Sequence, residues 1–363
     1  GLQPGDRVAV CGKNQANWTV AFLASMTGGY VPVSLLHEFH PDNIGELIVH
    51  SDSKIVFTDE SIWNSLDKAK MPEVVLNLKD FTAIKGPDSF MESVSEEFKG
   101  LYPFGFSPSR VKYHEDAPEE LAMINYTSGT SGFSKGVMLP YRAVEVNMDA
   151  ALYVAEPQMT AGHNVVSILP CAHMYGLMFE TLYEMTKGVH VHYLARVPSP
   201  RIIVDTFKDV KPDLIVAVPL IMEKVYKSGV KKLLTKYSFF FKLPGIGKLL
   251  KNYMCSTITK SFGSRFEEVI LGGAPLNPEV EAFLRSVGFR FTCGYGMTEC
   301  APLITYVKWH STRQGSCGVA IPGMQIRIDS PDPQNVPGEV LVSGKGVFLG
   351  YFKNPEATAA AST

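Results

Sequence analysis

The stretch that decides the fold opens with RVAVC at residues 7–11 and continues with WTVAFLASM at residues 18–26. The first segment is a short apolar run, as in a buried strand, and the second has apolar residues at helical spacing. The alternation repeats with YVPV at residues 30–33, a helix that starts near Pro41, and KIVFT at residues 54–58. Proline is tolerated in the first turn of a helix. Strand–helix–strand alternation predicts a parallel sheet with helices on its faces.

The same alternation extends toward the C-terminus. Strand patterns recur at residues 121–126, 165–169, 189–193, 214–218 and 269–271, with helical patterns at 142–155 and 279–286. Residues 64–120 are less periodic, and we expect them to include excursions on the surface. After about residue 310, short strands at 325–329 and 338–342 with Pro/Gly turns between them predict a small all-β unit.

The composition is that of a folded protein and argues against some functions. Of the 363 residues, 45% are hydrophobic and 19% are charged, which excludes a largely disordered chain. The formal net charge of −2 argues against a dedicated nucleic-acid binder. The six cysteines form no Cys-x-x-Cys pair and no zinc spacing, as in a reducing compartment. The longest apolar stretch, residues 214–222, contains Pro219 and is too short to span a bilayer, so we expect a soluble, cytoplasmic protein.

A loop of small hydroxyl and glycine residues carries the strongest chemical signal. It reads YTSGTSGFSKG at residues 126–136 and lies between two apolar runs. Glycines let backbone N–H groups turn toward a polyanion, and the hydroxyls add donors. Lys135 adds a positive charge for phosphate. The loop is not a Walker A motif, because no Gly-Lys-Ser/Thr ends it. A flexible linker has no reason to carry one Lys between two strands.

This loop resembles the phosphate-binding signature of the adenylate-forming superfamily, which includes acyl-CoA synthetases, luciferases and peptide-synthetase adenylation domains. These enzymes join a carboxylate to ATP, giving an acyl-adenylate and pyrophosphate. Two further motifs agree, GGAPL at residues 272–276 and GYGMTE at residues 294–299. The segments 315–323 and 338–358 resemble the family's β-barrel region. The resemblance implies an α/β fold of two layered α/β/α subdomains with mostly parallel sheets, plus a small β-barrel subdomain.

The resemblance also implies a role for each motif residue. Tyr295 would stack on adenine, Thr298 would meet the α-phosphate, and Glu299 would hold Mg²⁺, for which a carboxylate is a suitable hard ligand. The implied catalytic residues are Thr298, Glu299, Lys135 and His173. The implied ATP-binding residues are Thr127, Ser128, Gly129, Thr130, Ser131, Gly132, Lys135, Gly272, Gly273, Ala274, Pro275, Tyr295, Gly296 and Thr298. ATP, Mg²⁺ and CoA would be the cofactors and co-substrates.

The resemblance divides the chain into subdomains. Residues 1–28 and 152–308 would form the α/β subdomain with the adenine and acyl site, and residues 29–151 the α/β subdomain with the phosphate-binding loop. Residues 309–355 would form the β-barrel, and residues 356–363 a truncated tail. The family pattern then continues with a Thr-Gly-Asp element, a hinge and a C-terminal domain whose Lys assists adenylation. We therefore expect an N-terminal domain that turns over poorly or not at all.

Two segments bear on the substrate. LPCAHM at residues 169–174 resembles the Leu-Pro-x-x-His element of fatty-acyl members, in which the His lies near the carboxylate; a core His is the alternative for His173. VPLIMEKVY at residues 218–226 resembles a run of long-chain fatty-acid members. Amino-acid-activating relatives place an Asp shortly after the His, whereas Glu180 is the first acid here. An apolar acid is therefore favoured over an amino acid.

The function implied is that of a long-chain fatty acid–CoA ligase, with fatty acid, ATP and CoA as substrates and no nucleic-acid partner. A medium-chain or aryl acid–CoA ligase and a fatty-acyl-AMP ligase remain alternatives within the class. A non-catalytic nucleotide- or acyl-binding module is the alternative from another class. Lys135 and Glu299 count against that module, since binding alone does not demand both.

Residues 224–251 form an unusually basic segment, with eight lysines and no Asp, Glu or Arg. Tyr226, Val230, Leu233, Leu234 and Tyr237 fall on one helical stripe. A basic amphipathic helix with aromatic residues can lie on an anionic membrane surface, so we hypothesise peripheral membrane contact through this segment. The alternative is a solvated lysine face over a helix packed on the core. Both interpretations stay open at the level of sequence.

Overall fold

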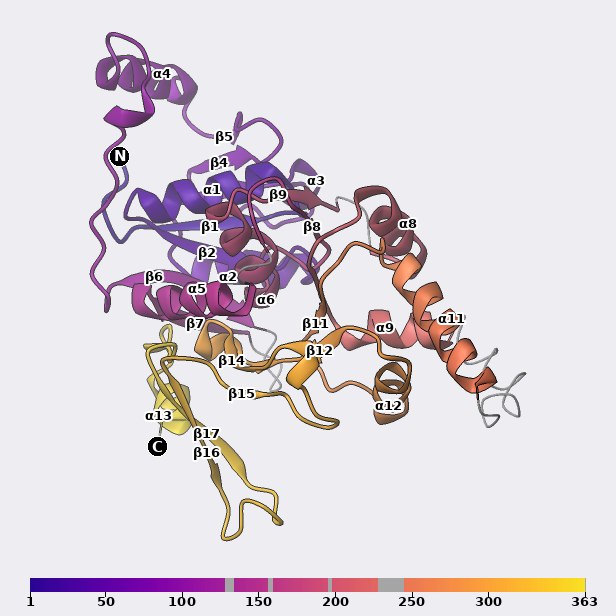
Figure 1. Cartoon of the computed structure of the whole chain (residues 1–363). Coiled ribbons are helices and arrows are strands. Elements are labelled where there is room, and N and C mark those ends of the chain that lie inside the picture. The colour runs from indigo at the N-terminus through magenta and orange to yellow at the C-terminus, as the bar shows by residue number, and fades with distance from the viewer. Residues whose placement is uncertain (128–133, 156–158, 195–197, 228–244, 363) are drawn as a thin grey trace. The chain divides into compact units, whose positions relative to one another are not determined.

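The computed structural model in Figure 1 describes residues 1–127, 134–155, 159–194, 198–227 and 245–362. Five of the predicted ATP-binding residues lie outside these ranges: Ser128, Gly129, Thr130, Ser131 and Gly132. The chain divides into two compact units. Unit 1 comprises residues 1–144, 170–173 and 348–363, and unit 2 comprises residues 145–169 and 174–347.

Unit 1 is built on an eight-stranded sheet with the order β18-β7-β6-β2-β1-β3-β4-β5. Its strands are β1 (Arg7–Cys11), β2 (Val31–Leu35), β3 (Ile55–Thr58), β4 (Val74–Asn77), β5 (Ala83–Lys85), β6 (Leu121–Thr127), β7 (Lys135–Pro140) and β18 (Gly350–Tyr351). Strands β6, β2, β1, β3 and β4 pair in parallel, while β5, β7 and β18 are antiparallel to their neighbours. The parallel sheet predicted from residues 7–58 is confirmed.

Helices cover both faces of this sheet. α1 (Ala16–Thr27) connects β1 to β2, and α2 (Pro41–His50) connects β2 back past β1 to β3. Because crossover connections are right-handed, two crossovers in opposite directions place their helices on opposite faces. α2 starts at Pro41, as predicted, and packs Ile44 and Ile48 on buried strand residues. α1 buries Trp18 and Phe22, whose rings stack at 5.5 Å.

Unit 1 also contains further helical segments. They are α3 (Glu60–Trp63), α4 (Phe90–Leu101), the 3₁₀ turn η1 (Pro108–Arg110) and α13 (Pro355–Ala361). α4 has no buried residue, and in Figure 1 it stands apart from the sheet of its unit. This agrees with the surface excursions expected within residues 64–120.

Unit 2 carries two parallel sheets. β8 (Asn164–Ser167) pairs with β9 (His190–Tyr193), and β11 (Val269–Leu271) lies between β10 (Ile215–Ala217) and β12 (Phe291–Cys293). The helices of this part are α5 (Tyr141–Ala155), which begins in unit 1, α6 (Met174–Leu177), the π-helix η2 (Met178–Leu182), α7 (Tyr183–Thr186), α8 (Pro200–Val210), α9 (Pro219–Val225), α11 (Ile246–Ser261) and α12 (Pro278–Val287). Within the ranges the structure describes, no helix is both long and apolar enough to cross a membrane.

The chain then changes to antiparallel strands. β14 (Leu303–Tyr306) pairs with β13 (Tyr295–Gly296) and β15 (Val319–Ala320), and β16 (Met324–Asp329) pairs with β17 (Glu339–Gly344). Two short 3₁₀ turns, η5 (Thr298–Cys300) and η6 (Trp309–Ser311), interrupt this region. Short strands after residue 310 are therefore present as predicted, whereas a closed barrel over 309–355 stays a prediction.

Two strands pair differently from the predicted subdomains. β1 lies within residues 1–28, which were grouped with residues 152–308, yet it pairs with β2 and β3 in the sheet of unit 1. The two-residue strand β18 lies within the predicted barrel range, yet it pairs with β7. Strand pairing thus assigns both to the eight-stranded sheet. The other subdomain boundaries stay predictions.

Candidate active site

In unit 1, a hairpin holds the two ends of the predicted phosphate-binding loop. Thr127 ends β6 and Lys135 begins β7, and the two residues are cross-strand partners. The Lys135 ammonium lies 4.9 Å from the centroid of the Tyr351 ring, which β18 places beside β7. A cation over an aromatic face is held electrostatically by the ring. The contact with the Tyr351 ring therefore fixes the position of the Lys135 ammonium at the start of β7.

A short turn brings His173 to the same end of β6. Asn125, two residues before Thr127, donates from Nδ2 to the carbonyl of Ala172 at 2.7 Å. The Cys171 amide donates to Oδ1 of Asn14, which follows β1, at 2.8 Å. His173 reaches solvent, but crowding by surrounding atoms removes water from part of its ring and lowers its pKa. Thr127, Lys135 and the turn that carries His173 thus lie at the same end of the β6–β7 pair in unit 1.

In unit 2, the predicted adenine-side residues follow the carboxyl ends of parallel strands. Gly272 comes directly after β11, where its amide donates to the Ala217 carbonyl at 3.2 Å. A Cβ at Gly272 would lie 3.0 Å from the ring of Tyr175, so only glycine fits without displacing that ring. Gly273 has a φ of +81° and is exposed, as are the following Ala274 and Pro275. The turn therefore exposes its backbone from Gly273 to Pro275, and the buried ring of Tyr175 packs against Gly272.

The neighbouring loop carries Tyr295, Gly296, Thr298 and Glu299. A Cβ at Gly296 would lie 2.0 Å from the carbonyl oxygen of Pro302, so this position tolerates only glycine. Thr298 and Glu299 lie on η5 and are half-buried. Burial raises the pKa of Tyr295, which therefore keeps its proton and presents a neutral ring. The close approach at Gly296 fixes where this loop turns.

Asn147 of α5 holds the same loop from behind. Its Nδ2 donates to the Cys300 carbonyl at 2.9 Å, and its Oδ1 accepts from the Leu303 amide at 2.8 Å. The side chain is fully buried. Two hydrogen bonds from one buried amide fix the turn that follows Glu299, because either backbone group left unpaired would cost free energy.

Sequence reasoning missed four residues that position the candidate site, namely Asn14, Asn125, Asn147 and Tyr175. A signal was present for Asn125, since an amide inside the apolar run LAMINYT must find a partner when buried. Tyr175 follows His173 by two residues, and its hydroxyl donates to the Ile270 carbonyl at 3.0 Å. The position of the Tyr175 ring against Gly272 depends on packing between segments that are far apart in the sequence. The spacing of residues along the chain cannot reveal such packing.

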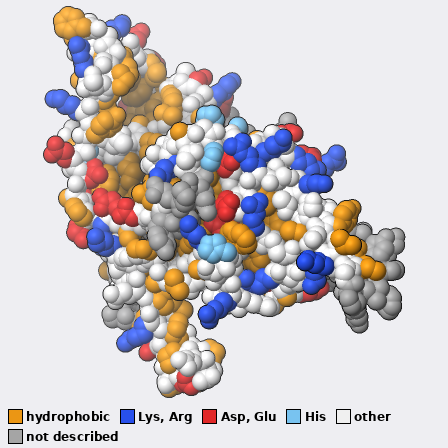
Figure 2. Space-filling view, viewed as in Figure 1, with side chains coloured by type: hydrophobic (Ala, Val, Ile, Leu, Met, Phe, Trp, Pro, Cys, Tyr) orange, Lys and Arg blue, Asp and Glu red, His pale blue; other side chains and the backbone are white. Residues whose placement is uncertain are grey.

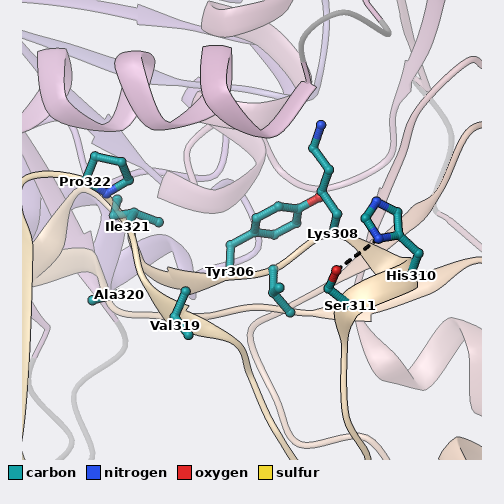
Figure 3. A pocket seen from close by; sticks show the side chains of 9 residues that line it. Tyr306, Lys308, His310, Ser311, Val319, Ala320, Ile321 and Pro322 are labelled. Carbon is teal, nitrogen blue, oxygen red and sulfur yellow. Dashed lines mark hydrogen bonds between the residues drawn. The ribbon is translucent and has the colours of Figure 1, made fainter.

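A pocket of about 350 Å³ lies elsewhere in unit 2 and contains none of the predicted site residues. Figure 3 shows Val319, Ala320, Ile321 and Pro322 on one side of it and Lys308, His310 and Ser311 on the other. The Nδ1 of His310 lies 2.9 Å from the Ser311 hydroxyl. The walls are mainly aliphatic.

Comparison with known proteins identifies the family. The family model described as AMP-binding enzyme matches residues 1–352. This chain belongs to the AMP-binding enzyme family. The predicted resemblance and the mixed α/β fold with parallel-rich sheets are therefore confirmed.

Relatives of this AMP-binding chain include acyl-CoA synthetases. It is 28% identical over 396 residues to long chain acyl-CoA synthetase 1 of Arabidopsis thaliana, covering 99% of the chain and 59% of that protein. It is 25% identical over 394 residues to the long-chain-fatty-acid–CoA ligase of Escherichia coli O6:H1, covering 99% of the chain and 64% of that ligase. The chain thus spans less than two thirds of the length of these relatives.

Solved structures share the fold. ATP-bound MatB from Rhodopseudomonas palustris matches with a TM-score of 0.72 at 23% identity, over 99% of this chain and 64% of that one. The N-terminal domain of FACL13 from Mycobacterium tuberculosis matches with a TM-score of 0.72 at 18% identity, over 100% of this chain and 82% of that one. At these identities the likeness establishes the fold alone.

Proposed function

We propose that this chain carries the adenylation site of a long-chain fatty acid–CoA ligase. In the first reaction a carboxylate oxygen of the acid attacks the α-phosphorus of ATP, and the bond from that phosphorus to pyrophosphate breaks. In the complete enzyme the thiol of CoA then attacks the acyl carbon, and AMP leaves. The observation that carries the proposal is the loop 294–299, which Gly296 and Asn147 hold at the end of β12 beside Gly272.

Each residue of that loop has a role suited to adenylation. The neutral ring of Tyr295 offers a flat apolar face to adenine, and the open backbone of Gly272 and Gly273 allows a base to approach closely. The hydroxyl of Thr298 can donate to an α-phosphate oxygen, where negative charge develops. Such donors act in the transition state when they are already in position before the reaction.

In unit 1, Lys135 would contact the phosphates, and His173 would contact the reacting carboxylate. The Tyr351 ring keeps the Lys135 ammonium in place, and the turn fixed by Asn14 and Asn125 keeps His173 in place. A neutral imidazole can donate one hydrogen bond to a carboxylate without an ion pair that must be broken later. The lowered pKa of His173 favours this neutral form near pH 7.

Glu299 fits a Mg²⁺ that arrives with ATP. Among the described residues, no group of three or more His, Cys, Asp or Glu side chains could hold a metal by itself. Mg²⁺ in nucleotide sites is bound by one or two carboxylates together with phosphate oxygens, which one half-buried carboxylate satisfies. When bound, Mg²⁺ neutralises charge on the phosphates.

The first acid after His173 supports an uncharged substrate. Glu180, the first acid after His173, is fully buried in unit 2 and accepts a hydrogen bond from the Leu169 amide at 2.9 Å. Burial raises its pKa well above the ordinary value, so its carboxyl stays protonated. A protonated, buried acid cannot pair with the ammonium of an amino acid. The preference for a fatty acid over an amino acid rests on this and on the similarity to a long chain acyl-CoA synthetase and a long-chain-fatty-acid–CoA ligase.

Binding of Mg²⁺–ATP tests the proposal. We expect titration calorimetry on the 363-residue chain to detect ATP binding that requires Mg²⁺ and is lost in Glu299→Gln. Glu92→Gln, at the surface of α4, is the matched control and should bind as the wild type does. Glu299→Gln that binds Mg²⁺–ATP as tightly as the wild type would overturn the proposal. Pyrophosphate release by the complete enzyme with octanoate, hexadecanoate and benzoate would then rank the acyl classes.

A further inference from the structure

One residue of the stripe predicted in the lysine-rich segment, Tyr226, can be located in the structure. Tyr226 is buried. Its hydroxyl donates to Glu279 at 3.0 Å, and its ring packs on Phe283 with centroids 5.2 Å apart. Tyr226 therefore faces the core of unit 2 and cannot contact a membrane. The other four members of the stripe lie outside the described residues.

A different apolar stripe is exposed on α11. Ile246, Leu249 and Tyr253 are 43%, 70% and 63% exposed, and their spacing places them on one side of the helix. The opposite side is buried through Met254 and Ile258. α11 is therefore packed on its own unit by one face while it presents a second apolar face to solvent.

The charges on the helix that carries this stripe are all of one sign. α11 contains Lys248, Lys251 and Lys260 and no Asp or Glu among its 16 residues. Lys224 and Lys227 lie on and just after α9 in the same unit, where Glu223 lies 3.9 Å from Lys227. In the view of Figure 2, orange and blue side chains gather at the right-hand side, where Figure 1 places α11.

The comparison with α4 shows that this combination is specific. α4 exposes Val94, Phe98 and Leu101, yet it also carries Glu92, Glu96 and Glu97. An apolar stripe between acidic residues is repelled by an anionic surface, whereas one between lysines is attracted to it.

We propose that the exposed face of α11 docks on a lipid bilayer that contains anionic headgroups. Leu249 and Ile246 enter the boundary between headgroups and acyl chains, and Tyr253 lies at that boundary, where an amphipathic aromatic ring is favoured. Lys248, which precedes Leu249 on one flank of the stripe, and Lys260, two turns beyond Tyr253 and in line with the stripe, lie against the headgroup phosphates. This surface belongs to unit 2 alone and does not depend on the proposed catalytic function.

Vesicle co-sedimentation of the 363-residue chain tests the docking face. We expect binding to vesicles of phosphatidylcholine with about a third phosphatidylglycerol, and little binding to phosphatidylcholine alone. Lys248→Gln with Lys260→Gln should lower the partition coefficient about 25-fold, roughly fivefold for each lysine. Leu249→Ser should lower it roughly tenfold, because the apolar area no longer enters the bilayer.

Leu101→Ser on α4 is the matched control, since Leu101 is 66% exposed, close to the 70% of Leu249. It should leave vesicle binding unchanged. The proposal is overturned if anionic vesicles do not bind the chain, if the double lysine variant binds like the wild type, or if Leu101→Ser causes the same loss as Leu249→Ser. It is also overturned if sedimentation velocity shows that Leu249→Ser abolishes self-association while vesicle binding persists, since a second copy would then occupy this face. If Leu249→Ser does not fold, the double lysine variant still tests the same docking face.

Discussion

At the scale of single residues, Asn147 fixes the turn that follows Glu299. Its amide bridges the Cys300 carbonyl and the Leu303 amide from a fully buried position. Gly296 contributes from the other side, because no side chain fits between its Cα and the Pro302 carbonyl. The side chain of Asn147 and the lack of a side chain at Gly296 together determine where Thr298 and Glu299 lie.

Asn147→Ala should therefore weaken both stability and nucleotide binding. The substitution leaves a buried carbonyl and a buried amide unpaired, at a cost of about 2–3 kcal/mol. We expect the unfolding midpoint to fall by several degrees and the affinity for Mg²⁺–ATP to fall with it. Asn17→Ala is the control, because Asn17 makes one surface hydrogen bond to the Lys79 carbonyl. Equal effects of the two substitutions on Mg²⁺–ATP affinity would argue against a positioning role for Asn147.

A second residue-scale prediction concerns the Tyr351 ring beneath Lys135. Tyr351→Leu removes the aromatic face and should lower the affinity for Mg²⁺–ATP about two- to fivefold, the usual range for an exposed cation–π contact. Tyr351→Phe keeps the face and should bind nearly as the wild type does. Phe352→Leu, which removes the neighbouring ring beneath Arg7 and Lys353, serves as the matched control. If Leu and Phe at position 351 behave alike, the ring does not position Lys135.

At the scale of elements, the positions of strands and helices were predicted well from the sequence, whereas the elements that each one packs on or pairs with were predicted less well. The apolar runs at residues 7–11 and 269–271 coincide with β1 and β11, because a buried parallel strand leaves a clear local pattern. β18 was missed, since two residues that pair with β7 carry no periodicity of their own. For Tyr226 the sequence left two interpretations open, and the structure buries it, because an amphipathic pattern does not say whether an apolar stripe meets the core or a membrane. The sequence named the motifs of the candidate site, which stay predictions, but it did not name the asparagines that hold them.

The π-helix η2 and the helix α7 that follows it hold two buried carboxyl groups, Glu180 and Glu184. Neither carboxyl oxygen of Glu184 has a hydrogen-bond partner among the described residues. Burial raises the pKa of Glu184 from the ordinary 4.5 to about 8. The folded chain thus keeps a proton that the unfolded chain releases above pH 4.5. This contribution to stability is complete below that pH and is lost as the pH rises toward 8.

Glu184→Gln should remove this pH dependence. The neutral amide resembles the protonated acid, so we expect little change in the unfolding midpoint at pH 5 and a clear rise at pH 8. The difference between the two pH values should correspond to roughly 3–5 kcal/mol in the wild type. Thermal unfolding followed by circular dichroism at both pH values measures it, with Glu96→Gln on exposed α4 as the control. A wild-type midpoint that does not fall between pH 5 and pH 8 relative to Glu184→Gln would contradict the expectation.

At the scale of the whole molecule, the two units are interleaved in sequence. The chain passes between them four times, after Val144, Leu169, His173 and Val347. The residues that follow Val347 return to unit 1, where β18 pairs with β7 and Lys353 donates to Asp52 at 2.8 Å. The net charge of −2 is likewise a sum over unlike parts, since residues 224–251 contribute +8. Neither unit is a continuous piece of chain, so an end of the chain can stabilise a distant sheet.

Removal of residues 348–363 should therefore weaken unit 1 and leave the neighbouring strands of unit 2 intact. Without β18, β7 becomes an unpaired edge, and Lys135 loses the Tyr351 ring. We expect faster amide hydrogen exchange in β6 and β7 and unchanged exchange in the hairpin β16–β17, although that hairpin lies closer in sequence to the cut. Removal of residues 355–363 alone keeps β18 and costs it the hydrogen bond from the Tyr351 amide to Thr358, so the effect should be smaller. Faster exchange in β16–β17 with unchanged β7 would mean that the last residues stabilise unit 2 instead.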